Sequence, residues 1–129
     1  MIIRRLNYGA DLCEEIKRVC EEEKITSGWF NAVGALKKLS FGFYDQKKKK
    51  YGKIKFSKPC EIASCAGNIS EIDGEVFVHA HICFADERGN VRGGHLFDSV
   101  IFACEAGIFS VAKKLKREYD KKTGLKLWK

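Results

Sequence analysis

All three histidines of the chain, His79, His81 and His95, lie in the segment VHAHICFADERGNVRGGHL at residues 78–96. If the first half of this segment is a strand, His79 and His81 point to the same side, with Cβ atoms roughly 6.5 to 7 Å apart. A turn in the middle of the segment would place His95 opposite His81 on the next strand. Three neutral imidazoles at one point are typical of sites that bind a divalent transition metal, most often zinc, and leave one position open.

Two glycines precede the third histidine and favour its approach to the other two. Gly93 and Gly94 carry no side chain, so they permit a bulge or a close approach of two backbones. The predicted convergence depends on register, because a slip of one residue would turn His95 to the opposite face. One alternative is that two of the histidines are ordinary polar residues on a solvent-facing side of the sheet and that the clustering is chance. Another is that the histidines help the sheet pack and hold a structural metal or none.

Six cysteines are many for this length, but none form a CxxC pair and most lie inside apolar runs. They are Cys13, Cys20, Cys60, Cys65, Cys83 and Cys104. This pattern is typical of buried, reduced thiols rather than of a disulfide framework. Cys83 shares the predicted face of His79 and His81. Cys65 is expected opposite His81 across a hairpin, so either thiolate is a candidate fourth ligand, although we favour a core role for both.

A second hypothesis makes the chain a metal-dependent enzyme, a hydrolase or a lyase. Three histidines on zinc lower the pKa of a bound water toward about 7, which supplies a nucleophile. Glu61, Glu75 and Glu105 are candidate general bases, and Asn68 and Ser70 are candidates for orienting a substrate. No base can be assigned to the site from the sequence, so the catalytic residues stay open.

The chain has 129 residues, of which 45% are hydrophobic and one is proline, and no internal repeat divides it. We therefore expect a single domain over residues 1–129 whose core needs no disulfide. No apolar run approaches the roughly 20 residues that span a bilayer, and no secretory signal pattern opens the sequence. These features predict a soluble, cytoplasmic protein with no membrane association.

The first predicted element is an amphipathic helix within residues 9–25, where apolar side chains recur at helical spacing. Asp11 precedes them as a candidate N-cap. Residues 27–45 alternate around glycines in the way short strands do.

Residues 60–96 predict three strands joined by two turns, one at Asp73-Gly74 and one near Arg88. Residues 97–122 fit either one long helix or strands followed by a basic segment. Gly107 and the β-branched residues of this stretch favour strands.

The formal net charge of +7 favours polyanionic partners without naming one. Four consecutive lysines follow Gln46 and are expected at a solvated hairpin tip. The candidate contacts to nucleic-acid phosphates are Lys47, Lys48, Lys49, Lys50, Lys113 and Lys114. Such contacts give weak, salt-sensitive and nonspecific DNA binding, because lysine carries little base-reading chemistry.

Nearly the whole chain resembles the PPC domain family, the plants-and-prokaryotes-conserved domain. The matching stretches include RLNYGADLCEEI, GWFNAVGAL, FGFYD, CEIASCAGNIS, DGEVFVHAHICFADERGNVRGGHL and CEAGIFSV, in the order of the family. The GNIS, HAH and GGHL elements together are the specific part of the match. The only proline is Pro59 and no RGRP-type AT-hook is present, so the chain is similar to the stand-alone members of prokaryotes and archaea.

This resemblance implies an α/β (α+β) fold, in which helices flank a largely antiparallel sheet, assembled as a homotrimer. It also favours strands after His95. Prokaryotic members resemble metal-binding proteins that use the histidines of the HxH and GGH elements, here His79, His81 and His95. A regulatory or DNA-binding role is implied only by analogy with plant members, which bind DNA chiefly through the AT-hook.

Overall fold

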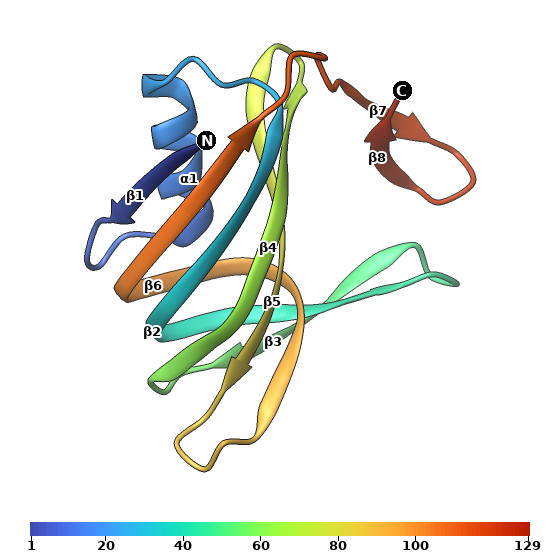
Figure 1. The fold of residues 1–129 in the computed structure, drawn as a ribbon. Coiled ribbons are helices and arrows are strands. Elements are labelled where there is room, and N and C mark those ends of the chain that lie inside the picture. Colours follow the sequence, from blue (N-terminus) through green and yellow to red (C-terminus); the bar gives the residue numbers. More distant parts are fainter.

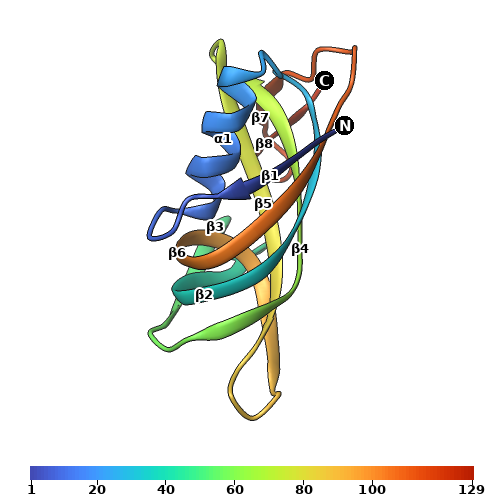
Figure 2. The ribbon, with the colours of Figure 1, turned by 60° about the vertical axis from the view of Figure 1, so that its left-hand side comes forward.

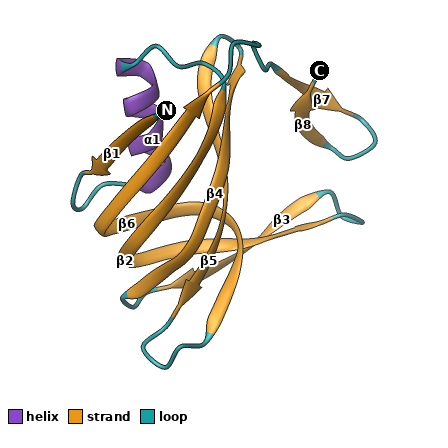
Figure 3. Ribbon diagram, viewed as in Figure 1, coloured by secondary structure: helices purple, strands orange, loops and turns teal.

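Six antiparallel strands form one curved sheet in the computed structural model, which describes all residues from 1 to 129 (Figures 1 and 3). The strands are β1 (Ile2–Leu6), β2 (Gly28–Asp45), β3 (Lys50–Phe56), β4 (Cys60–Ile72), β5 (Glu75–Ala85) and β6 (Val91–Ser110). Their order is β1-β6-β5-β4-β2-β3, and β6 also pairs with β2. Strands β2, β4, β5 and β6 pair in a closed ring, β2 with β4, β4 with β5, β5 with β6 and β6 with β2, so the sheet curls around its inner face. The predicted antiparallel sheet is confirmed.

A single helix, α1 (Leu12–Glu22), covers the inner face beside β5 and β6 (Figure 2). The Asp11 carboxylate caps it by accepting from the backbone N–H of Glu14 at 3.0 Å. The same carboxylate accepts from the N–H of Ser99 in β6 at 2.7 Å, which ties the cap to the sheet. The predicted helix and cap are confirmed, but the expectation of several flanking helices is wrong. No helix of this chain is long and apolar enough to cross a membrane.

The core lies between α1 and the inner face of the sheet and contains most of the cysteines. All six thiols are free, and the fully buried ones are Cys20, Cys60, Cys65 and Cys104. Burial raises the pKa of Cys65 to about 12, so this thiol stays protonated at neutral pH. Cys83 is exposed, and the core role expected for it is wrong.

A tight turn over residues 86–90 joins β5 to β6 where the sequence predicted one. The Asp86 carboxylate accepts from the backbone N–H groups of Arg88 at 2.9 Å and Asn90 at 3.0 Å. Gly89 takes a φ of 77°, which glycine adopts without steric cost. These contacts fix the point at which the chain reverses.

Two glycines let the backbone of β6 approach its neighbours immediately before His95. A Cβ on Gly94, whose φ is 152°, would lie 2.3 Å from the carbonyl oxygen of Gly42 in β2. A Cβ on Gly93 would lie 2.3 Å from the carbonyl oxygen of Ile82 in β5. Real Cβ atoms do not fit at such distances, so β6 requires glycine at both positions, in agreement with the predicted close approach.

The chain after His95 is one continuous strand to Ser110, which settles the ambiguous stretch in favour of a strand. A separate two-stranded hairpin follows, β7 (Arg117–Asp120) and β8 (Leu125–Trp128), which the sequence did not predict (Figure 1). The hairpin contacts the β2–β3 tip through the Tyr44 hydroxyl, which donates to the Thr123 carbonyl at 2.8 Å. The final residues of the chain thereby fold back toward the main sheet.

Candidate metal centre

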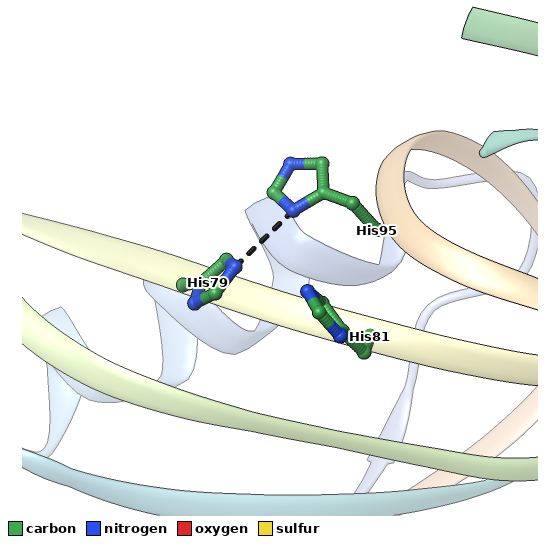
Figure 4. A group of neighbouring side chains, drawn as sticks. All are labelled: His79, His81 and His95. Carbon is green, nitrogen blue, oxygen red and sulfur yellow. Dashed lines mark hydrogen bonds between the residues drawn. The ribbon is translucent and has the colours of Figure 1, made fainter. Parts of the chain in front are cut away.

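The three histidines converge on one point at the end of the β5–β6 ladder (Figure 4). His81 and His95 are direct cross-strand partners, as predicted, and His79 lies two residues earlier on the same face of β5. One nitrogen from each ring lies within 4.8 Å of the other two. His79 Nε2 and His95 Nδ1 are 3.2 Å apart.

These distances between ring nitrogens are compatible with all three rings binding the same metal ion. Zinc–nitrogen distances of about 2.0–2.1 Å and tetrahedral angles place ligand nitrogens about 3.4 Å apart. The pair formed by His79 and His95 is already close to that value, and the exposed His81 has a ring nitrogen within 4.8 Å of both. The donor set of three imidazoles suits a divalent transition metal and leaves at least one coordination position for another ligand.

The surroundings keep two of the three imidazoles neutral. Burial lowers the pKa of His95 to about 4, and the neighbouring His81 adds to this effect. Burial also lowers the pKa of His79 to about 4, followed by the effects of His95, His81 and Arg117. A neutral imidazole presents a lone pair, so these two rings are ready to bind a metal at neutral pH without first losing a proton.

Aromatic side chains surround His95 and fix the position of its ring. The Tyr51 ring lies 4.6 Å from it and the Phe97 ring 4.8 Å from it, centroid to centroid. Tyr51 reaches this place because β3 folds back on β2, where Gly42 is the partner of His95. Tyr51 was not predicted as a site residue, since its place depends on the joint registers of β3, β2 and β6.

Neither candidate thiol joins the three histidines. Ala66, not Cys65, is the partner of His81, and Cys65 pairs with Ile82 and points into the core. The prediction for Cys65 is wrong by one position, which in a strand means the opposite face. Cys83 lies on the predicted face but pairs with Gly93, beyond the histidine group.

The three glutamates considered as general bases also lie outside the group. Glu61 pairs with Ala85 toward the far end of β5, Glu105 faces β1 and β2, and Glu75 ends in solvent near Lys17. The metal-ligand group contains no carboxylate.

Asn68 and Ser70 do lie beside the site, as partners of His79 and Phe77 on the neighbouring strand. Both accept hydrogen bonds from Arg117 of β7. Because Arg117 lies in the unpredicted hairpin, nothing in the sequence pattern connected it with the histidines.

The lysines predicted to contact phosphates fall in two places. The residues Lys47, Lys48, Lys49 and Lys50 form the exposed β2–β3 tip. The Lys49 ammonium donates to the Lys121 carbonyl at 2.8 Å, so this tip lies next to Lys121 and Lys122 of the last hairpin. Lys113 and Lys114 are exposed in the connection between β6 and β7, apart from the tip.

Comparisons with known proteins agree with this architecture. A family model described as the Plants and Prokaryotes Conserved (PCC) domain matches residues 1–112. Among solved structures, a metal-containing protein from Archaeoglobus fulgidus is 39% identical, with a TM-score of 0.94 over 98% of this chain and 91% of that chain. A plant- and prokaryote-conserved protein from Pyrococcus horikoshii is 36% identical, with a TM-score of 0.94 over 99% of this chain and 90% of that chain.

A third structure, a candidate DNA-binding protein from Bacteroides thetaiotaomicron, is 27% identical, with a TM-score of 0.93 over 98% of this chain and 90% of that chain. Among curated proteins, the bifunctional protein GlmU of a Synechococcus strain is 32% identical over 124 residues. That match covers 93% of this chain, and the chain spans only 18% of the GlmU length.

The lowered pKa values of His79 and His95 predict how stability depends on pH in the metal-free protein. The unfolded chain has histidine pKa values near 6.5, so between about pH 6.5 and 4 it binds protons that the folded state does not. The free energy of unfolding should therefore fall as pH drops from 7 to 5. Urea denaturation in the presence of a chelator measures it.

The double variant His79→Gln/His95→Gln provides the comparison for this measurement. It should lose less stability than the wild type over the same pH interval, because its glutamines do not titrate. If the free energy of unfolding fell equally with pH in the two proteins, the lowered pKa values of His79 and His95 would be contradicted.

Proposed function

This chain belongs to the Plants and Prokaryotes Conserved domain family, and on that premise we propose that it is a metal-binding module with a regulatory, nucleic-acid-associated role. Its ligands for the metal are His79, His81 and His95. The observation that carries the proposal is the placement of one nitrogen from each ring within 4.8 Å of the others.

We assign the metal as zinc. Neutral imidazoles suit zinc among the divalent transition metals, and three of them with one open position form a common zinc donor set. The metal-containing archaeal relative supports a metal at this fold. When bound, zinc supplies an electrophilic centre that can hold an oxygen or nitrogen of a further ligand.

The fixed surroundings of the histidines support binding of a metal over chance clustering. His95 packs against Tyr51 and Phe97, which also contact each other, and this packing limits the motion of the His95 ring and so the side-chain entropy lost on coordination. Burial keeps His79 and His95 unprotonated. Histidines clustered by chance on a solvent-facing surface would not be expected to show either the aromatic packing of His95 or the burial of His79 and His95.

We propose that the module is a homotrimer. Alternate residues of β2 and β6 face away from the core, and several of these are large and apolar. Trp29 and Phe109 are cross-strand partners that remain 46% and 43% exposed, and Val33 is 56% exposed. Apolar side chains gathered on one outer face are typical of a surface that associates. Asn68, the partner of both Trp29 and His79, links this face to the metal site.

A nucleic-acid-associated role is supported by the two adjoining hairpins. The lysines of the β2–β3 tip lie beside Lys121 and Lys122, which concentrates positive charge on one exposed edge. Lys113 and Lys114 are also exposed, but in the connection to β7 and apart from this edge. Such a surface attracts phosphate groups without reading base sequence.

Loss of one ligand should abolish stoichiometric metal binding. Purified wild type, loaded with zinc and dialysed, should retain about one zinc ion per chain by elemental analysis, and His79→Ala should retain less than a tenth of that amount. Two imidazoles cannot hold the ion at comparable affinity. Cys83→Ala is the matched control, since this thiol shares the strand face without joining the ligands.

Equal zinc content in the wild type and His79→Ala would contradict the proposed ligands. Loss of zinc from Cys83→Ala would instead place the thiol in the site. Zinc content after the same treatment with a chelator present gives the background of the elemental analysis for each of the three proteins.

The proposed trimer predicts a particle of three times the 14.6 kDa chain mass in light scattering. The variant Trp29→Asp should shift the protein toward smaller species, because a carboxylate on the apolar face would be buried without a partner. Lys38→Asp, at an exposed position of β2 that already carries a charge, should leave the mass unchanged. A wild-type mass of 14.6 kDa would contradict the trimer.

Duplex DNA should bind weakly, with an affinity that falls steeply as salt rises and does not depend on sequence. The triple variant Lys47→Gln/Lys48→Gln/Lys50→Gln should reduce the slope of log affinity against log salt by about 0.9 for each lost phosphate contact. Lys49 is retained because it holds the last hairpin. Fluorescence anisotropy of a labelled duplex measures the slope.

The control for this measurement neutralises three exposed lysines elsewhere, at Lys24, Lys38 and Lys58. It has the same net charge as the tip variant. The slope of log affinity against log salt should change less in this control than in the tip variant. An equal change in both would show that DNA binding depends only on the net charge of the protein. Absence of salt-dependent binding by the wild type would remove the nucleic-acid role.

A further inference from the structure

Arg117 of β7 is held against the main sheet by all three of its guanidinium nitrogens. Nε donates to the Ser70 hydroxyl at 2.8 Å and Nη2 donates to Asn68 Oδ1 at 2.6 Å, both on β4. Nη1 donates to the carbonyl oxygen of Lys126 at 2.8 Å. The guanidinium also lies over the rings of Phe77 and Trp128, at 5.3 and 5.7 Å from their centroids. The side chain is therefore fixed in one orientation.

This position is next to the histidines. Asn68 is the cross-strand partner of His79, and Phe77 precedes His79 by two residues on the same face of β5. The Arg117 charge helps to lower the pKa of His79 and opposes the rise that burial causes in the pKa of Tyr51. The contacts with Asn68 and Phe77 place Arg117 beside His79, and Tyr51 lies against His95 in the same group of histidines.

No carboxylate of the chain pairs with this arginine. Arg4 and Arg18 form ion pairs with glutamates, whereas Arg117 has only neutral acceptors. Partial burial disfavours its charge and lowers its pKa. A half-buried cation without a counter-charge is costly unless another anion approaches it.

The guanidinium keeps donors for such an anion. Arginine has five N–H groups, and the contacts to Ser70, Asn68 and Lys126 use three of them. One N–H remains on each of Nη1 and Nη2. Two such groups match the two oxygens of a carboxylate.

We propose that Arg117 and the Tyr51 hydroxyl form an anion subsite beside the three histidines, which binds the carboxylate of a small ligand whose other polar group coordinates the metal. This inference rests on the proposed metal-binding function. It makes the centre a receptor for a small carboxylic acid and assigns that role to a residue beyond the segment matched by the family model.

A carboxylate fits better than a phosphate group. The subsite has one guanidinium between flat aromatic rings, and neither a second cation nor a helix N-terminus lies among its contacts. Phosphate sites usually combine several such donors.

The test uses protein loaded with cobalt(II), whose visible absorption changes when a ligand enters its coordination sphere, and malonate as the probe. Malonate has two carboxylates, one for the metal and one for Arg117. Arg117→Gln should raise the malonate Kd by tenfold or more, measured by absorption and by calorimetry. Arg117→Lys should recover part of the loss, because it restores the charge without the fork of donors.

Arg92→Gln is the matched control, since Arg92 also lies over an aromatic ring, that of Phe56, but far along the β5–β6 hairpin. It should leave the malonate Kd unchanged. Tyr51→Phe, which keeps the packing against His95, should weaken malonate several-fold and serves as the second test if Arg117→Gln loosens the last hairpin. Cobalt stoichiometry should remain one per chain in every variant.

An unchanged malonate Kd in both Arg117→Gln and Tyr51→Phe, with cobalt bound, would overturn the subsite. Tighter binding of inorganic phosphate than of malonate by the wild type would overturn the carboxylate assignment. Failure of the wild type to bind cobalt would overturn the proposed function instead, and malonate binding to the metal-free wild type and Arg117→Gln would still decide the role of Arg117.

Discussion

The β5–β6 ladder ends at the pair formed by His81 and His95, and the position of the whole site depends on this register. Side chains on a strand alternate between faces, so only this pairing brings His95 onto the side that His79 and His81 share. The Asp86 hydrogen bonds fix the turn, and Gly94 allows β6 to leave β5 and pass close to β2. One short hairpin therefore sets the relative positions of the three histidines.

Packing around this hairpin gives the imidazoles their chemical state. The rings of Tyr51 and Phe97 pack against His95, and partial burial keeps it neutral, as it does His79. The last hairpin adds a positive charge at the rim through Arg117, which disfavours protonation of His79 further. In the proposed site, metal binding and anion binding would support one another, since a bound cation and a fixed guanidinium both attract a ligand oxygen.

The histidine triad was predictable from the sequence because it requires only strand alternation and one local turn. Cys65 was misplaced although the turn at Asp73-Gly74 was predicted correctly, because that turn pairs Ile72 with Glu75 and so places Ala66 opposite His81. A difference of one residue there selects the other face. Arg117 escaped prediction for another reason: it joins the site through contacts between segments distant in sequence, and no short-range pattern specifies them. The antiparallel sheet and α1 followed from local patterning, whereas the final hairpin did not.

The central claim is that one metal ion is shared by His79, His81 and His95. Anomalous diffraction from a crystal of the zinc-loaded protein, collected on both sides of the zinc absorption edge, tests it most directly. The account predicts one strong anomalous peak per chain, at about 2.0–2.1 Å from a nitrogen of each of the three rings. Absence of a peak among these rings, or a peak held by other residues, would contradict it.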